Sequence, residues 1–349
     1  MKTIIGREHG EQDDESGFSR SQHMKLSIYY QIGITVAIAL CASCASQANT
    51  YKMGEPTRTI SIPKELDYNF LAWVSADEIV FLRAVGDSPG QETYSILIYS
   101  VAQDIRRELV APSLNGCSNT RLGWLYRYAL DEVLYLSVCN HNDQGHFVGS
   151  QDSIKRVSIL ESNSQDVFVG PTNFHITQFA YQPDGSGRLL LETLSHDFFE
   201  ATSDGVLQQI DLGYEGLSGP AWSPDGQFLA FLATSDPSAT TPPPWDLFVA
   251  DSSYSGLRKL LSNIRTPAHV KWSINGDWVA FRGNYDGLDG VWALNLNSSK
   301  LVRVWLEQVS FDWSPDENDQ LVILNPNEEN GSDANPSIVF VSISQGVQQ

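Results

Sequence analysis

The chain has 349 residues, of which 42% are hydrophobic and 18% are charged, a composition typical of a globular protein large enough to enclose a core. Its 22 Lys and Arg residues stand against 42 Asp and Glu residues, so the formal net charge is −20. Such a charge repels the phosphates of nucleic acids, and we therefore expect no nucleic-acid partner.

Residues 1–48 are interpreted as an N-terminal extension that contains a targeting segment. Met24 begins the run MKLSIYYQIGITVAIALCASCASQA, which has a basic start, an apolar middle and small residues near its end. This is the organisation of a signal peptide. The polar residues before Met24 leave open whether translation starts at Met1 or at Met24.

Three fates of this extension are open. Cleavage after Ala48 agrees with the small residues of the sequence SQA that ends there. Lipidation at Cys44 agrees with the Ala-Ser pair before it, although Cys41 stands where a lipobox has Leu. An uncleaved membrane anchor is the third fate, because Leu26–Ala45 is about long enough to span a bilayer. All three export the remainder to the periplasm or cell surface, and only this segment is expected to meet a membrane.

Short strands separated by tight turns are predicted after the extension. The stretch Ala221–Ala233, AWSPDGQFLAFLA, contains a turn in which Pro224 fixes φ near about −65°, Asp225 can bond its own backbone and Gly226 takes a positive φ. The apolar run after the turn is rich in aromatic and aliphatic residues, as strands are. Amphipathic helical spacing is almost absent.

An aromatic residue followed by a turn and an apolar run recurs along residues 49–349. The six aromatic residues are Trp73, Trp124, Tyr181, Trp222, Trp272 and Trp313. They lie 51, 57, 41, 50 and 41 residues apart, close to the ~40–50 residues of a four-stranded propeller blade. We therefore expect an all-β, six-bladed β-propeller of four-stranded blades, in which these aromatic side chains pack between adjacent blades.

The ends of the repeat array suggest how the ring closes. The last unit ends in SIVFVSISQGVQQ and has no room for a complete fourth strand, whereas Thr57–Ile62, TRTISI, reads as a strand before the first repeat. A propeller with unpaired first and last strands would leave an open edge. We expect Thr57–Ile62 to pair within the last blade.

The turn sequences resemble those of the TolB-like propeller family, a WD-like family with an aromatic-Ser-Pro-Asp-Gly repeat. The resemblance is carried by WSPDG at 222–226, WSPD at 313–316, WSING at 272–276 and YQPDG at 181–185. The two units that begin at Trp73 and Trp124 lack Pro-Asp-Gly. The resemblance implies the propeller alone, because TolB proteins carry a separate α/β domain before it and no such domain is evident here.

Two cysteines lie beyond the extension, Cys117 and Cys139. They are nearly equidistant from the turn around Tyr128, so they would face each other across an antiparallel pair. A disulfide between them is predicted, in keeping with an oxidising compartment. Two free buried thiols are the alternative.

No catalytic motif withstands inspection. Gly86–Gly90, GDSPG, matches G-x-S-x-G, but a nucleophile elbow needs a following helix and the backbone N–H of the residue after Ser, which Pro89 lacks. Zinc-protease, phosphate-loop, EF-hand and Cys/His zinc spacings are absent from the sequence. We assign no catalytic residue and no cofactor.

One end of the predicted blades gathers histidines and acids. The histidines of the predicted loops between second and third strands, or between blades, are His141, His146, His175, His196 and His269. Acids assigned to the same end include Asp197, Glu200, Asp236, Asp246, Asp286 and Asp289. Three interpretations compete: solvated loops that collect polar residues, a recognition face for a protein or cationic ligand, and a metal-assisted site. Trp245, after three prolines, is either an exposed anchor for a partner or the start of a third strand.

The sequence favours an exported cell-envelope propeller that acts as a non-catalytic scaffold. Its partner would be an envelope protein or a small ligand bound at the acidic loop face. The alternative is a metal-assisted lyase or glycosidase that uses His and carboxylates at the channel mouth, with a divalent metal as its cofactor. The sequence indicates no oligomeric state.

Overall fold

The computed structural model describes residues 51, 53–61, 68–85, 93–111, 117–118, 125–129, 131–141, 147–202, 205–238, 243–315, 319–325 and 336–343. Contacts divide the chain into two units, Met1–Thr50 and Tyr51–Gln349. The predicted signal peptide, its candidate lipidation site Cys44 and the candidate anchor Leu26–Ala45 lie outside the described residues. Among the residues that are described, no helix is long and apolar enough to span a bilayer.

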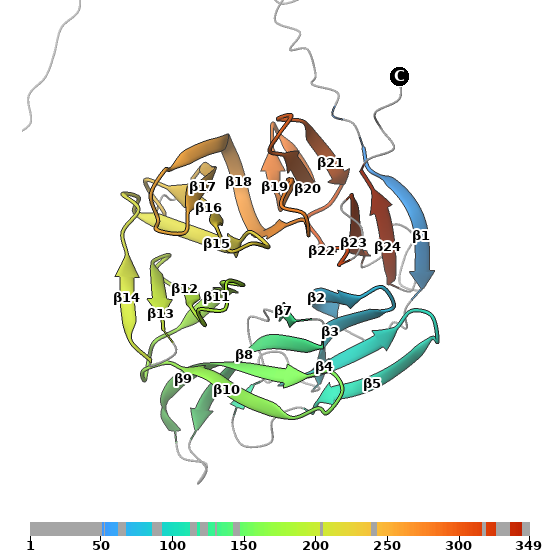
Figure 1. The fold of residues 1–349 in the computed structure, drawn as a ribbon, viewed down its shortest axis with the longest axis vertical. Helices are drawn as coiled ribbons and strands as arrows, with labels where there is room; N and C mark the ends of the chain where they lie inside the picture. Colours follow the sequence, from blue (N-terminus) through green and yellow to red (C-terminus); the bar gives the residue numbers. More distant parts are fainter. Residues whose placement is uncertain are drawn as a thin grey trace, which may run out of the picture. The chain divides into compact units, whose positions relative to one another are not determined.

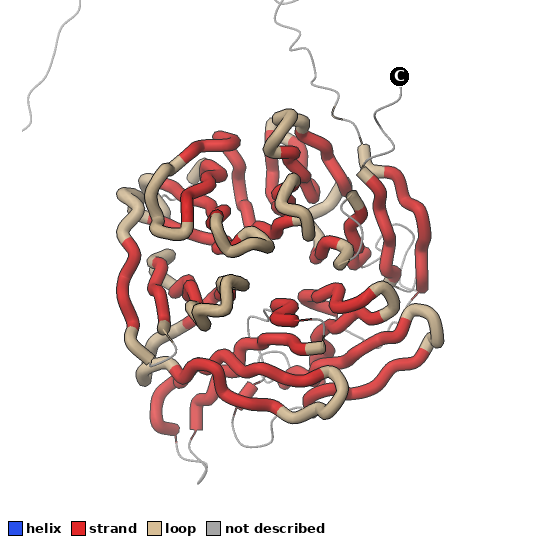
Figure 2. Tube along the Cα trace, viewed as in Figure 1, coloured by secondary structure: helices blue, strands red, loops and turns tan. Residues whose placement is uncertain are grey.

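The second unit is built from antiparallel sheets, and its described residues contain no helix (Figure 2). One sheet contains, in chain order, β2 (Tyr68–Ser75), β3 (Glu78–Val85), β4 (Thr93–Ser100) and β5 (Ile105–Val110). The next contains β6 (Cys117–Ser118), β7 (Leu125–Ala129), β8 (Glu132–His141), β9 (Phe147–Ser158) and β10 (Ser164–Val169), with β6 and β7 both paired to β8. A third contains β11 (Ile176–Tyr181), β12 (Leu189–Thr193), β13 (Phe198–Ala201) and β14 (Leu207–Ile210).

A seven-stranded sheet follows, and one long strand joins its two halves. Its strands are β15 (Gly216–Trp222), β16 (Phe228–Thr234), β17 (Trp245–Asp251), β18 (Arg258–Trp272), β19 (Trp278–Tyr285), β20 (Leu288–Asn295) and β21 (Leu301–Trp305). The first part of β18, to Ile264, pairs with β17, and the part from Arg265 pairs with β19. Two four-stranded halves therefore share β18.

The last sheet combines the two ends of the second unit. It contains β22 (Ser310–Trp313), β23 (Gln320–Asn325), β24 (Ser337–Ser342) and β1 (Glu55–Ser61). The predicted N-terminal strand is thus β1, which pairs antiparallel with β24 from Glu55 opposite Ser342 to Ser61 opposite Ser337. Just before it, Gly54 donates its backbone N–H to Arg303 O of β21.

The sheets have a propeller-like arrangement around a common centre (Figure 1). Strands β2, β11 and β15 lie innermost, whereas β5, β14 and β1 lie at the periphery. Consecutive sheets, and the two halves that share β18, contact each other through one strand each: β2 with β7, β7 with β11, β11 with β15, β15 with β18, β18 with β22 and β22 with β2.

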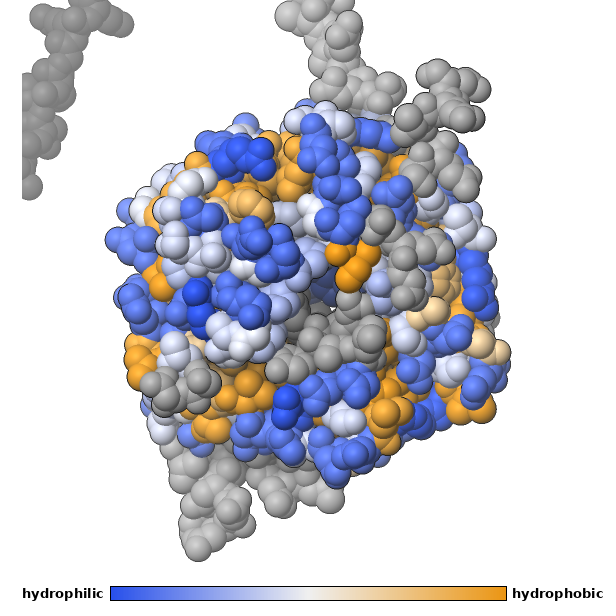
Figure 3. Space-filling view, in the orientation of Figure 1, coloured by the Kyte–Doolittle hydropathy of each residue, from blue (hydrophilic) through white to orange (hydrophobic). Residues whose placement is uncertain are grey.

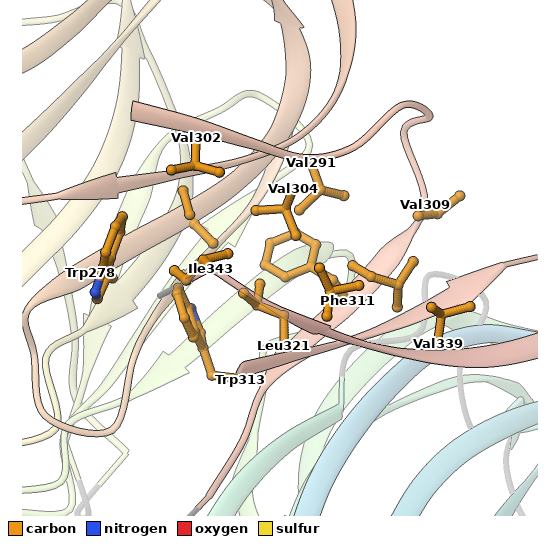
Figure 4. Close-up of a cluster of buried hydrophobic side chains, with 14 residues drawn as sticks. Trp278, Val291, Val302, Val304, Val309, Phe311, Trp313, Leu321, Val339 and Ile343 are labelled. Carbon is orange, nitrogen blue, oxygen red and sulfur yellow. The ribbon is translucent and has the colours of Figure 1, made fainter. Parts of the chain in front are cut away.

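The apolar core lies between consecutive sheets. In one cluster, Val291 and Val304 of the β19–β21 part pack against Phe311, Leu321 and Val339 of the last sheet (Figure 4). The recurring aromatic residues belong to such clusters and are buried at Trp73, Tyr181, Trp222 and Trp313, while Trp272 is partly buried. Their predicted packing between blades is confirmed at these five positions, and Trp124 lies outside the described residues.

The Ser-Pro-Asp-Gly turn has a defined hydrogen-bond pattern. Gly226, at φ 69°, donates its N–H to Ser223 O at 2.8 Å. Ser223 Oγ donates to Asp225 Oδ1 at 2.6 Å and accepts the N–H of Phe228 at 2.9 Å, so the serine joins the turn to the next strand. Ser273 repeats this role by accepting the N–H of Trp278 at 3.0 Å.

Candidate functional site

Strand alternation divides the connections between the two ends of the sheets. Links from second to third strands, and from one sheet to the next, open at one end, which we call the loop face. The Pro-Asp-Gly turns and the links from third to fourth strands open at the other end, the turn face. Within the described residues, the connections of the loop face include 170–175, 194–197, 211–215, 235–238, 243–244, 286–287 and 306–309. Residues 263–269, where β18 passes from one half of its sheet to the other, lie at the same end.

The sequence placed its candidate histidines on the loop face, and the described ones lie there. His175 precedes β11, His196 lies in the β12–β13 turn and His269 lies within β18. His141 is the last residue of β8, and His146 lies outside the described residues. These histidines come from different connections, so their shared face does not by itself make them one site.

His269 is buried rather than presented to solvent. It is 5% exposed, and its backbone takes a φ of 54°. Burial holds its pKa well below the ordinary value, and the positive charges of Arg282 and Lys271 lower the pKa further. His269 therefore belongs to the interior of the loop face.

Trp245 begins β17 and is only 8% exposed, so it is not an exposed anchor for a partner. Its ring meets the His196 ring edge-on, with 5.4 Å between the ring centroids. The three prolines before it suggested exposure, but Trp245 belongs to the apolar cluster between its own strands and β19–β20, which includes Phe281 and Trp292.

His196 is coupled to a buried carboxylate that the sequence analysis did not single out. Its Nδ1 lies 3.2 Å from Oε1 of Glu192, whose side chain is 2% exposed. The other oxygen of Glu192 accepts the backbone N–H of Gly219, in β15 of the next sheet, at 2.9 Å. The hydrogen bond to Glu192 raises the pKa of His196 above its ordinary value, against the opposing effect of burial.

A second polar group lies where three loop-face connections meet. Gln308 donates its Nε2 to Thr266 Oγ1 at 3.1 Å and to Asp289 Oδ1 at 2.8 Å. Asn284 Nδ2 donates to the same Asp289 oxygen at 3.1 Å. We call Thr266, Asn284, Asp289 and Gln308 the Thr266 cluster.

Asp286 and Asp289, both predicted site residues, are exposed but held in place. Asp286 accepts the Tyr51 hydroxyl at 3.1 Å, and the Tyr51 ring packs edge-on against Trp292 with centroids 4.8 Å apart. Asp289 accepts hydrogen bonds from the other cluster members Gln308 and Asn284, and the guanidinium of Arg303 donates to its backbone oxygen at 2.9 Å. The loop face therefore presents these carboxylates in defined positions.

The connection within β18 carries unusual backbone conformations. The φ angle is 63° at Asn263, 46° at Thr266 and 54° at His269. A left-handed conformation is disfavoured for a β-branched residue such as Thr266. Strained residues of this kind persist only where surrounding structure over-determines them, and they cluster at functional sites.

Acidic side chains do not distinguish the loop face. Its described connections contain Asp197, Asp211, Glu215, Asp236, Asp286 and Glu307, with Arg265 as their basic residue. The turn face contains Asp77, Asp104, Asp131, Glu161, Asp184, Asp225, Asp277 and Asp319. Hydrophilic residues predominate on the face shown in Figure 3, where apolar residues form separate groups.

Glu200 was assigned to the loop face from the sequence, and this assignment is wrong. It lies in β13, where its Oε2 is 3.0 Å from Arg188 Nη2 and accepts the Tyr254 hydroxyl at 2.5 Å. Arg188 and Tyr254 come from turn-face connections. The sequence could not separate the two ends of such a short strand.

Metal ligation has no complete ligand set in the part of the chain that the structure describes. There, no three His, Cys, Asp or Glu side chains come close enough together to hold a metal ion. Cys117 lies opposite Cys139 in the register between β6 and β8, as the sequence predicted, although their side chains lie outside the description.

Sequence reasoning missed the partners of the predicted residues. Glu192 had a local signal, since it is the one charged residue in the apolar strand LLLET. Thr266, Gln308 and Tyr51 had none, because they meet only through contacts between distant segments.

No protein-family model and no curated protein matches the chain. Among solved structures, TolB from Acinetobacter baumannii is similar over 78% of this chain, with 12% identity and a TM-score of 0.54. The similarity spans 65% of that TolB chain, which is less than two thirds of its length. An oligogalacturonate lyase from Vibrio parahaemolyticus is similar over 84% of this chain and 93% of that one, with 10% identity and a TM-score of 0.51. At these identities the likeness concerns the fold, which is that of a TolB-like β-propeller.

Proposed function

We propose that the chain is an exported, closed, six-bladed propeller that acts as a non-catalytic scaffold and binds its partner on the loop face. Two observations support six blades and closure. The strands β2, β7, β11, β15, β18 and β22 are neighbours in an uninterrupted circuit. The strand β1, from the start of the second unit, pairs with β24 near its end.

Export is supported by the signal-peptide organisation of residues 1–48 and by the register of Cys117 opposite Cys139. A disulfide at this position suits an oxidising compartment. Thiol titration of denatured, unreduced protein isolated from the cell envelope tests both points. We expect no free thiol from this pair, and two titratable thiols would contradict the disulfide.

The Thr266 cluster carries the binding role. Thr266 keeps a left-handed backbone, and its hydroxyl is bridged through Gln308 to Asp289. This ordering of exposed polar groups from three connections gives a preorganised surface, and preorganisation lowers the entropic cost of binding. The neighbouring carboxylate of Asp286 favours a basic partner, either an envelope protein or a small cationic ligand.

Site-specific crosslinking in cells tests the assignment of face. A photo-crosslinking amino acid at Glu307, exposed on the loop face, is compared with one at Gln227, exposed on the turn face. We expect a discrete covalent adduct from position 307 and none from position 227. Adducts from position 227 alone would show that the partner binds the turn face, and this result would overturn the proposal.

The competing function is a metal-assisted lyase or glycosidase. One structural neighbour is an oligogalacturonate lyase, so oligogalacturonate is the substrate with which to test this function, although the likeness covers the fold alone. Incubation with and without manganese, followed by assay for unsaturated products, separates the two functions. If the protein forms unsaturated products and a chelator abolishes this activity, the enzyme function is favoured over the scaffold function.

A further inference from the structure

The β12–β13 turn, residues 194–197, is joined to the next sheet at three points, all of which involve His196 or its partner. The backbone oxygen of His196 accepts the N–H of Leu217 at 2.7 Å. Its ring packs on Trp245. Through Glu192, the imidazole is linked to the N–H of Gly219.

The carboxylate of Glu192, which joins His196 to Gly219, lies in an unusual position for a charged group. Glu192 is buried on β12, between Leu191 and the turn. A buried carboxylate is unfavourable unless it is paired and hydrogen-bonded. Gly219 supplies one hydrogen bond from a bulge in β15, where the register with β16 shifts between Ser218 and Ala221. His196 supplies the other partner, and only its protonated form brings a compensating charge.

The surroundings of His196 are predominantly acidic. On its own turn, Asp197 accepts hydrogen bonds from Ser195 and Gln209. The carboxylates that act on its charge are those of Glu192 on β12 and Asp197. On the neighbouring elements, Asp246 of β17 is paired with Lys259 of β18, and Asp211 and Glu215 lie in the connection before β15. Its contacts with β15 itself are made through backbone N–H groups. This environment favours the imidazolium.

We infer that Glu192 and His196 form a pH-sensitive latch, which holds the β12–β13 turn more firmly to the next sheet when His196 is protonated and loosens it when His196 is neutral. Loss of the proton leaves Nδ1 either as a neutral donor or as a lone pair facing the carboxylate, and the ion pair is lost in both cases. Leu194, 61% exposed at the tip of this turn, then becomes mobile on the loop face.

The sign of the effect follows from the direction of the pKa shift. The pKa of His196 is raised in the folded protein, so the latch contributes fully below the ordinary value of 6.5 and is lost as the pH rises through the raised pKa. Acidification therefore tightens this turn, whereas alkalinisation loosens it.

Two measurements on the free protein test the latch between about pH 5.5 and about pH 8.5, a range that brackets the ordinary pKa of His. NMR titration of the His196 ring should give a pKa above the ordinary value, and Glu192→Gln should lower it. Hydrogen exchange of the Leu217 amide, expressed as a protection factor, should show protection that falls several-fold as the pH rises.

Two further variants keep the test decisive if Glu192→Gln fails to fold. His196→Asn removes the titrating group while Asn tolerates the left-handed backbone, and it should abolish the pH dependence of Leu217 protection. His175→Asn, on the same face, should leave that dependence unchanged. A His196 pKa at or below the ordinary value, a constant Leu217 protection factor, or an unaltered dependence in His196→Asn would overturn the latch. Because no partner is added, failure of the proposed binding role cannot produce any of these results.

Discussion

Lys271 and Asp312 form an ion pair between the neighbouring strands β18 and β22, with 3.1 Å between Nζ and Oδ1 and both side chains 16% exposed. Each also reaches β2. Lys271 Nζ donates to Leu71 O at 3.3 Å, and the second oxygen of Asp312 accepts the N–H of Trp73 at 2.8 Å. The pair therefore ties together β2, β18 and β22, and β22 belongs to the sheet in which both ends of the second unit pair.

Replacing Asp312 by Ala should destabilise the protein strongly. The change leaves a largely buried ammonium group and the Trp73 N–H without their carboxylate, and breaking a buried pair in this way typically lowers the free energy of unfolding by about 3 kcal/mol. Denaturant unfolding measures the effect. The matched control is Asp166→Ala, which removes the more exposed partner of Lys155 and should change stability by less than about 1 kcal/mol. Equal effects of the two variants would refute the role of the first pair.

The N-terminal strand should act as a structural part of the last sheet. Deleting Tyr51–Ser61 removes β1, uncovers the edge of β24 and should lower the thermal midpoint by about 5 °C or more. A synthetic peptide of the same residues, added in excess, should restore part of the loss, whereas a scrambled peptide should not. A truncated protein that melts like the full chain would show that β1 is a dispensable tail.

Glycine is required at position 219 for two separate reasons. Its φ of 63° disfavours any side chain, and an added Cβ would lie 3.1 Å from Val270 Cγ2 and 3.3 Å from Leu232 Cδ1. Gly287 has a similar φ of 78°, but a Cβ there meets nothing within 4 Å.

The alanine variants of these two glycines separate backbone strain from crowding. Gly287→Ala should cost about 1 kcal/mol for the left-handed backbone alone. Gly219→Ala should lower the free energy of unfolding by about 2 kcal/mol more, since its methyl group also crowds Val270 and Leu232. Chemical denaturation of the two variants provides the comparison. Equal losses of stability would mean that the side chains around position 219 relax to make room for the new methyl group.

Sequence periodicity predicted what depends on local chemistry. The turns after Trp222 and Trp272 form because Ser, Asp or Asn and Gly occupy fixed offsets, so their hydrogen bonds are encoded within six residues. The N-terminal strand, predicted at Thr57–Ile62 and observed at Glu55–Ser61, could be assigned because the last unit was incomplete without it. The continuous strand β18 was not foreseen, because the sequence analysis placed His269 in a predicted loop.

Contacts between sheets had no comparable signal. Lys271 and Asp312 are separated by a whole repeat, and each reads locally as an ordinary polar residue of a strand. The burial of Trp245 and His269 likewise depends on which neighbouring strand faces them. The sequence therefore predicted the face on which the histidines lie, but not which of them are accessible.

The buried His269 should make the protein sensitive to acid. Its folded-state pKa lies well below the ordinary 6.5, so as the pH falls below about 6.5 the unfolded chain takes up a proton that the folded chain refuses. Stability contributed by the neutral ring is therefore lost on acidification, which is opposite in sign to the effect of His196.

His269→Asn, whose side chain tolerates the φ of 54°, removes this titration. The free energy of unfolding of this variant should fall less than that of the parent between pH values of about 7.5 and about 5. NMR of the parent provides a check that does not depend on the variant folding: the His269 ring signals should titrate with a pKa well below the ordinary 6.5. Parallel stability curves for the two proteins, together with a ring that titrates near 6.5, would show that His269 is accessible to solvent and that acid sensitivity arises elsewhere.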